Sequence, residues 1–133
     1  MPVKYGAKKR VEDTLIWSRS KQMNAIVRFI DALTSEGGLK GIDIANITDV
    51  SKATVSRWKA GDIKPQPRNE LILSDLHYVV GRLRDFYSPA EIRTWLYARH
   101  PQLNGERAID LIHDDRTLEV LAVIDRLENE VYI

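Results

Sequence analysis

Short and basic side chains with the spacing of a DNA-reading helix occupy residues 51–59 of this 133-residue chain. In a helix over this stretch, Val55 and Trp58 would point inward and Lys52 and Arg57 would point outward. An outward arginine can pair with guanine, while lysines and the amide end of a helix bind phosphate. The sequence therefore predicts DNA binding here. The predicted DNA-binding residues are Ser51, Lys52, Ala53, Thr54, Ser56, Arg57 and Lys59.

Residue patterns that support catalysis are missing from the sequence. There is no cysteine, and the three histidines, His77, His100 and His113, have no metal-binding spacing. No glycine-rich phosphate loop and no Gly-x-Ser-x-Gly motif occurs. We therefore expect a protein that is not an enzyme and that needs no cofactor. His77 falls near an apolar stripe and is predicted to be a packed core residue.

A helix-turn-helix over residues 41–61 is the element that would hold the basic residues outward. Ala45 is the small residue where the two helices cross, and Val50 is the apolar turn residue that points inward. Ser51 can cap the second helix. Asp49 stands where glycine is commonest and tolerates a left-handed backbone. The spacing also fits an ordinary helix hairpin in a bundle, and the serine cap and outward basic residues favour DNA binding.

Apolar residues recur with helical spacing along most of the chain, so the predicted fold is all-α, a small helical bundle. The expected stripes are Met23, Ile26, Ile30 and Leu33; then Ile72, Leu76, Val79, Leu83 and Phe86; then Ile92, Trp95 and Leu96; then Ala108, Leu111 and Ile112; and finally Leu118, Leu121, Ile124 and Leu127. No alternating run is long enough to predict a strand.

Proline, glycine and cap residues mark the expected boundaries between these helices. Gly37-Gly38 stops the first stripe, and the prolines of residues 62–67 exclude a helix interior. Residues 88–91, Ser-Pro-Ala-Glu, form a strong helix start. Asn104-Gly105 predicts a turn, and Asp114 or Asp115 is expected to cap the last helix.

Charge is divided unevenly along the chain. Residues 1–68 carry 13 Lys and Arg against 7 Asp and Glu, whereas residues 101–133 carry 3 against 8. The basic front half suits a polyanion, although chance surface patterning would give the same asymmetry. The basic N-terminal segment, residues 1–20, could lie along phosphates or remain a solvated terminus. With 44% apolar residues and no run long enough to span a membrane, we expect a cytoplasmic protein without membrane contact.

Two stretches of the sequence resemble a known family. The first is residues 44–58, which resemble the Xre-type (Cro/repressor-like) helix-turn-helix. The second runs from Glu91 to Leu96 and from His100 to Ile112, and is similar to the toxin-binding domain of Xre/MbcA/ParS antitoxins. The chain departs from the family pattern at Ala108, where proline is frequent, and at Asn104 and Glu130, where glycine is frequent.

The resemblance implies an antitoxin that neutralises a cognate RES-type, NAD-consuming toxin by covering its active-site entrance with the C-terminal region. It also implies repression of the chain's own operon, with a homodimer and a hetero-oligomer as assemblies. On this basis residues 21–68 form the helix-turn-helix domain and residues 69–133 the toxin-binding domain. The toxin-binding residues that it implies are Trp95, Asn104, Gly105, Arg107, Glu130, Val131, Tyr132 and Ile133.

The residues themselves offer a reason for the role of the tail. Val131, Tyr132 and Ile133 are apolar or aromatic at a chain end, where polar residues are usual, and could fill a partner's pocket. The tail could equally pack on its own core. Two other functions stay open. One is a stand-alone repressor with a C-terminal dimerisation domain, and the other is an interaction module that has lost DNA binding.

Overall fold

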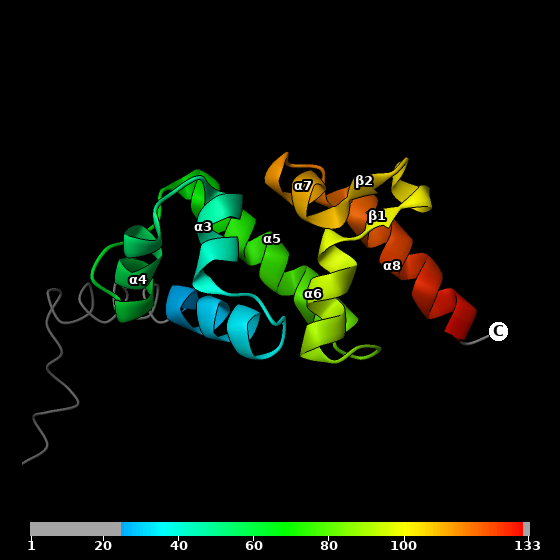
Figure 1. The fold of residues 1–133 in the computed structure, drawn as a ribbon, viewed down its shortest axis with the longest axis horizontal. Helices are drawn as coiled ribbons and strands as arrows, with labels where there is room; N and C mark the ends of the chain where they lie inside the picture. The colour runs from blue at the N-terminus through cyan, green and yellow to red at the C-terminus, as the bar shows by residue number, and fades with distance from the viewer. Residues whose placement is uncertain (1–24, 132–133) are drawn as a thin grey trace, which may run out of the picture.

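The computed structural model describes residues 25–131, which are mostly helical (Figure 1). Residues 25–35 are helical. The elements that follow are α3 (Gly41–Thr48), α4 (Lys52–Ala60), α5 (Pro67–Leu83), α6 (Pro89–Tyr97), β1 (Arg99–His100), the 3-10 helix η1 (Pro101–Leu103), β2 (Glu106–Arg107), α7 (Ala108–His113) and α8 (Thr117–Val131). The predicted all-α fold is confirmed. The basic segment 1–20, Met23, Tyr132 and Ile133 lie outside the described residues.

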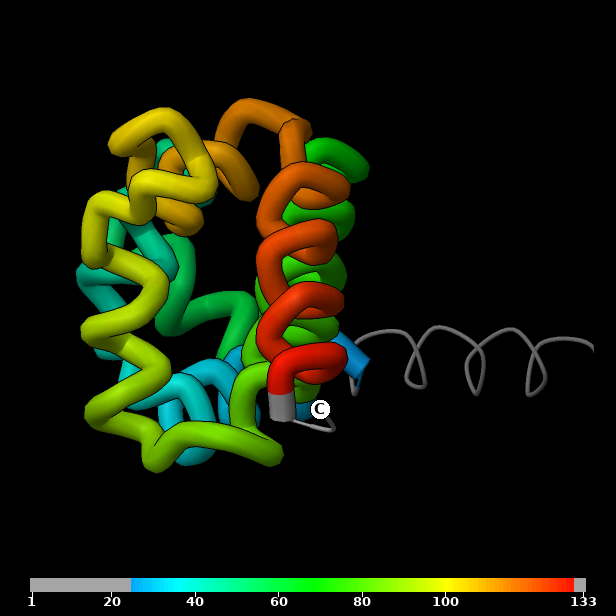
Figure 2. Tube along the Cα trace, turned by 90° about the vertical axis from the view of Figure 1, so that its right-hand side faces the viewer, coloured from blue at the N-terminus to red at the C-terminus, as the bar shows by residue number. Residues whose placement is uncertain are grey.

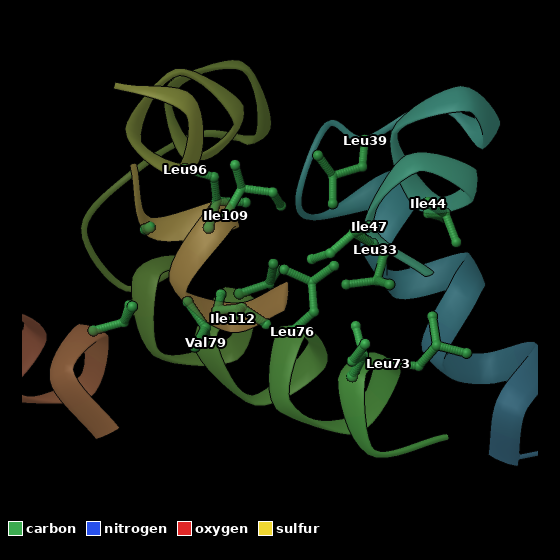
Figure 3. Packing of buried hydrophobic residues seen from close by; sticks show 14 of the residues in the cluster. Leu33, Leu39, Ile44, Ile47, Leu73, Leu76, Val79, Leu96, Ile109 and Ile112 are labelled. Atoms are coloured by element: carbon green, nitrogen blue, oxygen red, sulfur yellow. The ribbon is translucent and has the colours of Figure 1, made fainter. Parts of the chain in front are cut away.

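Helix α5 is the centre of the molecule, and its buried face meets helices from both halves of the chain. Figure 3 shows Leu73, Leu76 and Val79 of α5 beneath side chains from the front half and from α6 and α7. The buried apolar residues form one continuous cluster from Ile26 to Ile124. Burial at about 25 cal/mol per Å² makes this shared cluster the main stabilising contribution. The front and back halves of the chain are therefore packed on one core.

The helix at residues 25–35 and α8 both pack against α5. Phe29 stacks on His77 with ring centroids 4.6 Å apart, which places the helix at residues 25–35 against α5. On the other side, the Thr117 hydroxyl donates to Asp75 at 2.9 Å, and Arg82 donates to Asp125 further along at 2.7 Å. Residue numbers on α5 and α8 rise together between these two contacts, so the two helices point in the same direction. Figure 2 shows α5 and α8 side by side.

The turn at Gly37-Gly38 ends the first helix, as predicted, and brings the chain against α6. Gly38 has a φ of 65°. A Cβ atom at Gly38 would lie 2.5 Å from the carbonyl oxygen of Pro89, which only glycine avoids. The turn therefore lets the backbone of the front half touch the start of α6.

The predicted start of α6 is confirmed by its capping box. The Ser88 hydroxyl accepts from the Glu91 amide at 3.4 Å, and the Ser88 amide donates to the Glu91 carboxylate at 2.9 Å. Pro89 occupies the first helical position. Pro67 begins α5 in the same way, so the proline segment excludes a helix only as far as Gln66.

Several expectations about the back half were wrong. The last helix begins at Thr117, and neither Asp114 nor Asp115 caps it: Asp114 follows α7, and Asp115 has a left-handed backbone with φ 61°. Ile124 of the predicted stripe is buried and Leu121 is partly buried, but Leu118 is 81% exposed, because α8 also turns Val120 and Val123 inward. Phe86 lies beyond the end of α5 and is partly buried.

Two short segments of the back half also have a different secondary structure from the one expected. Residues 99–100 and 106–107 pair as antiparallel strands, with Arg99 opposite Arg107. Each strand has two residues, too few for an alternating pattern to appear in the sequence. Glu130 and Val131 belong to α8, so the expected tail begins no earlier than residue 132. Within residues 25–131, no helix combines the length and apolar character that a membrane span requires.

Candidate functional site

The α3–α4 unit has the buried anchors that the sequence predicted. Ala45 is 1% exposed at the contact between the two helices, and Val55 and Trp58 are buried on the inner face of α4. Val50 is only partly buried and packs against the core. The Thr48 hydroxyl donates to the Ile44 carbonyl at 2.6 Å within α3. The packing of α3 on α4 and the burial of Val55 and Trp58 hold α4 in one orientation.

The turn between α3 and α4 confirms two local predictions. Asp49 adopts the left-handed conformation, with φ 57° and ψ 41°. Ser51 caps α4, because its hydroxyl accepts from the Thr54 amide at 3.1 Å. The turn requires one residue with a left-handed backbone and one side chain that caps α4. Aspartate tolerates that backbone and serine is a favourable cap, which explains the residue types of Asp49 and Ser51.

The outer face of α4 presents the basic and short side chains to solvent. Thr54 is partly buried beside the cap, whereas the other predicted DNA-binding residues are exposed: Ser51, Lys52, Ala53, Ser56, Arg57 and Lys59. Within residues 25–131, neither Arg57 nor Lys59 makes an ion pair. A helix whose cations are unpaired and held outward by Val55 and Trp58 has the charge and shape to contact a polyanion.

A histidine from the back half holds the turn of the α3–α4 unit. His113 Nε2 lies 2.8 Å from the Asp49 carboxylate, and His113 Nδ1 lies 2.7 Å from Asp114. Hydrogen bonds to Asp114 and then to Asp49 raise the pKa of His113 above its usual 6.5. Arg68 lies 3.6 Å from the same Asp49 carboxylate. Sequence reasoning gave His113 no role, because its partner Asp49 is 64 residues away.

This contact predicts a pH-dependent stability. Because the folded pKa of His113 is raised, its contribution is fully present below pH about 6.5 and is lost as the pH rises through the folded pKa. We expect the free energy of unfolding of the wild-type protein to fall from about pH 6 to pH 8, and to fall less in His113→Gln. Urea unfolding at a series of pH values measures both slopes. Equal slopes in the two proteins would contradict the prediction.

A buried aspartate joins α3 to α6. Asp43 accepts from the Tyr97 hydroxyl at 2.7 Å and from the Arg93 guanidinium at 2.9 Å, while its second oxygen accepts from the Lys40 amide at 2.7 Å. Burial, followed by the hydrogen bond to Asp43, raises the pKa of Tyr97 to about 12. Arg93 also lies over the Tyr97 ring at 4.8 Å. The cluster fixes the α3–α4 unit relative to α6.

The hairpin after α6 brings together four of the predicted toxin-binding residues. Trp95 is partly buried and stacks on His100 with ring centroids 4.5 Å apart, while the His100 ring nitrogen bonds the Trp95 carbonyl at 2.8 Å. Asn104 and Gly105 form the predicted turn, with φ values of 57° and 80°. Arg107 pairs with Asp110 at 2.8 Å, so its charge is already partnered.

An open, mostly apolar groove runs along α6 beside Trp95. Its lining comes from α6, the turn before it and β1. The lining residues are Tyr87, Ala90, Glu91, Thr94, Trp95, Ala98 and His100. An aromatic residue at the wall of an apolar groove is a common anchor in protein–protein contacts. Sequence analysis placed Trp95 among the toxin-binding residues and residues 88–91 at a helix start, but it did not predict that these residues and His100 line one groove.

The structure separates Glu130, another predicted toxin-binding residue, from this hairpin. Arg116, just before α8, donates to Glu106 of β2 at 3.1 Å, so α8 starts beside the hairpin. Glu130 lies fourteen residues further along α8, which is about 20 Å at 1.5 Å per residue. Figure 1 shows the end of α8 pointing away from β1 and β2. Tyr132 and Ile133 lie outside the described residues.

The described chain is a small all-α protein in which an exposed basic helix and an apolar α6 groove share one core. No family model matches the sequence. MbcA, the mycobacterial cidal antitoxin of Mycobacterium tuberculosis and of Mycobacterium bovis, is 27% identical over 111 residues, which cover 84% of this chain and 98% of the relative. A probable mycobacterial cidal antitoxin of M. tuberculosis is 31% identical over 104 residues, covering 78% of this chain and 88% of the relative.

A solved structure agrees with this sequence similarity. A chain in the crystal structure of the M. tuberculosis MbcT–MbcA toxin–antitoxin complex matches with a TM-score of 0.71 and 27% identity. The match covers 80% of this chain and 96% of that chain. The chain therefore belongs to the MbcA-type family of antitoxins.

Proposed function

We propose that this antitoxin neutralises a cognate RES-type, NAD-consuming toxin through its C-terminal half and represses its own operon through α4. The observation that carries the proposal is the match to the MbcT–MbcA complex, which extends over nearly the whole matched chain. Residues 21–68 would then act as the helix-turn-helix domain and residues 69–133 as the toxin-binding domain. The RES chemistry is carried over from the family resemblance of the sequence.

The proposed operator contacts follow from the exposed face of α4. Arg57 and Lys52 project from a helix whose other side is fixed by buried Val55 and Trp58. The Ser51 cap leaves the first amides of α4 at an accessible end, where phosphate can bind. We assign Arg57 to base contact and Lys52 and Lys59 to phosphate contact.

The proposed toxin contacts combine an apolar groove with a chain end. Trp95 and His100 form one wall of the α6 groove, and the exposed turn at Asn104 lies beyond them. The C-terminal residues Val131, Tyr132 and Ile133 add an apolar, aromatic segment that suits a pocket in a partner. Because about 20 Å of α8 separates the hairpin from Glu130, we propose two separate points of contact on the toxin.

Co-expression with the neighbouring toxin gene tests the proposed neutralisation. We expect the neighbour to stop growth when it is expressed alone and to be harmless beside this chain, with the two proteins purifying together. A neighbour that is harmless alone, or that stays toxic in the presence of this chain, would refute the antitoxin role.

Removal of Val131 to Ile133 tests the role of the C-terminal end. We expect the truncated protein to lose neutralisation while its operator affinity stays the same, because α4 lies at the far end of the molecule (Figure 1). Growth during co-expression and operator binding are the two measurements. Asn129→Ala, at an exposed position just before this end, is the matched control and should still neutralise. Full neutralisation by the truncated protein would show that the end is not needed.

A further inference from the structure

Four charged side chains meet where α7 reaches the turn between α3 and α4. His113 Nε2 lies 2.8 Å from the Asp49 carboxylate, and His113 Nδ1 lies 2.7 Å from Asp114. Arg68, in the first turn of α5, donates to the His113 carbonyl at 3.3 Å and lies 3.6 Å from Asp49. We call Asp49, Arg68, His113 and Asp114 the turn cluster. Through this cluster, α5 and α7 both hold one residue of the α3–α4 turn.

The geometry of the turn cluster specifies a charged histidine. An ionised carboxylate accepts hydrogen bonds and donates none, so each contact of the His113 ring requires an N–H group. The charged ring has two such groups, whereas the neutral ring has one and turns a lone pair toward the other carboxylate. The hydrogen bonds to Asp114 and then to Asp49 raise the pKa of His113, and the hydrogen bond from His113 lowers the pKa of Asp49. Loss of the proton therefore breaks one of the two contacts.

Other titratable groups face His113 across a small pocket between α3, α6, β2 and α7. They are Asp43, Tyr97, Arg107 and Asp110. Asp43 accepts from the Tyr97 hydroxyl at 2.7 Å, and Arg107 pairs with Asp110 at 2.8 Å, so these groups are partnered among themselves. Burial, followed by the hydrogen bond to Asp43, raises the pKa of Tyr97 to about 12. Histidine is the side chain whose charge ordinarily changes between about pH 5 and pH 8, so we assign a charge change in this range to His113.

The turn cluster lies beside the end of α4 that the proposed function places against DNA. Asp49 comes two residues before Ser51, the N-cap of α4, so at most about 7 Å of chain separates them. The Asp49 side chain is 61% exposed, and a free carboxylate at this end would repel phosphate. In formal charge, the turn cluster is neutral when His113 is protonated and carries one negative charge when it is not. The proton on His113 therefore favours contact with a polyanion.

We propose that His113 is a positioning residue for operator binding, which in its charged form holds Asp49 in the α3–α4 turn and offsets the repulsion between this carboxylate and phosphate. This role rests on the proposed function of α4 as the operator-reading helix. Because the charged form favours binding, operator affinity is highest below the pKa of His113, which is raised above 6.5, and falls as the pH rises through it. One charge this close to phosphate should change the affinity about two- to fivefold.

The pH profile of operator affinity tests this role. The probe is a fluorescent duplex of the DNA upstream of the chain's own gene, bound by the full-length protein from about pH 5.5 to about pH 8.5 at constant ionic strength. We expect the wild-type affinity to fall about two- to fivefold, and His113→Gln to show a flat profile at the lower affinity. His113→Arg, which stays charged and donates N–H groups, should show a flat profile at the higher affinity. Circular dichroism at each pH checks that the proteins stay folded.

Two further variants test whether His113 acts through the turn. His77→Gln is the matched control and should keep the wild-type profile, because His77 stacks on Phe29 and is not part of the turn cluster. Asp49→Asn keeps a residue that tolerates the left-handed backbone. At about pH 8.5 it should bind more tightly than the wild type, because no carboxylate remains to be offset.

The outcomes separate this role from the proposed function. Parallel pH profiles of the wild type and His113→Gln would overturn the role of His113. So would an Asp49→Asn protein that binds no more tightly than the wild type at high pH. A wild-type protein that binds the duplex at no pH would instead refute the proposed function of α4, and this role with it.

Discussion

Replacing Asp43 by alanine is expected to lower the free energy of unfolding by about 2–4 kcal/mol. The carboxylate is buried and accepts three hydrogen bonds, from Tyr97, Arg93 and the Lys40 amide. Without it the Tyr97 hydroxyl loses its acceptor in a partly buried site, and α3 loses its N-terminal contact. The expected range begins below the roughly 3–5 kcal/mol typical of a fully buried pair, because Arg93 is 39% exposed and can be hydrated.

Urea unfolding measures this change, and Asp110→Ala is its matched control. Asp110 also pairs with an arginine, at 2.8 Å, but its side chain is 47% exposed. An exposed pair contributes about 1 kcal/mol or less. If Asp43→Ala destabilised the protein no more than Asp110→Ala, the buried cluster would not be the connection between α3 and α6 that the geometry indicates.

Arg57→Ala is expected to weaken operator binding by about 1–3 kcal/mol, which corresponds to a factor of about 5 to 150 in affinity. Arg57 is exposed on α4 and has no ion pair within residues 25–131, so its guanidinium is available to a base. Because Val55 and Trp58 carry the packing of α4, the stability of the protein should be unchanged.

The salt dependence of binding separates base contact from phosphate contact. Lys59→Ala should weaken binding to all sequences alike and reduce the slope of affinity against salt by about 1, whereas Arg57→Ala should relax the preference at one base position. Arg126→Ala, an exposed arginine on α8, is the control and should leave operator binding unchanged. Wild-type affinity of Arg57→Ala would remove this residue from the interface.

Local signals in the sequence were sufficient to predict the α3–α4 unit. Its helices, cap and turn depend on residues within a few positions of one another, such as Ser51 with Thr54 and the left-handed Asp49. The start of α6 was predictable for the same reason, because a capping box is complete within four residues. Short-range chemistry of this kind can be read without knowing the fold.

Long-range contacts account for most of what the sequence did not predict. Asp43 meets Arg93 and Tyr97 at separations of 50 and 54 residues, and no local pattern marks an aspartate at a helix start as buried. Leu118 was assigned to a core stripe because leucines at 118 and 121 fit one helical face. The structure rotates that face, since Val120 and Val123 pack inward beside Ile124 of the predicted stripe, while Leu118 is exposed. Which of two overlapping stripes is buried depends on the neighbouring helix.

The single core has a consequence for transplanting the front half onto another scaffold. Gly38 lies against the Pro89 carbonyl, and Asp43 is hydrogen-bonded to Arg93 of α6. Residues 25–61 therefore include one side of the interface with α6, and moving them alone leaves that side without its partner. A chimera that takes only these residues would present an unpaired carboxylate and exposed apolar surface. Under the proposed function, substitutions meant to change operator preference belong on the outer face of α4, where side chains can change without altering the junction.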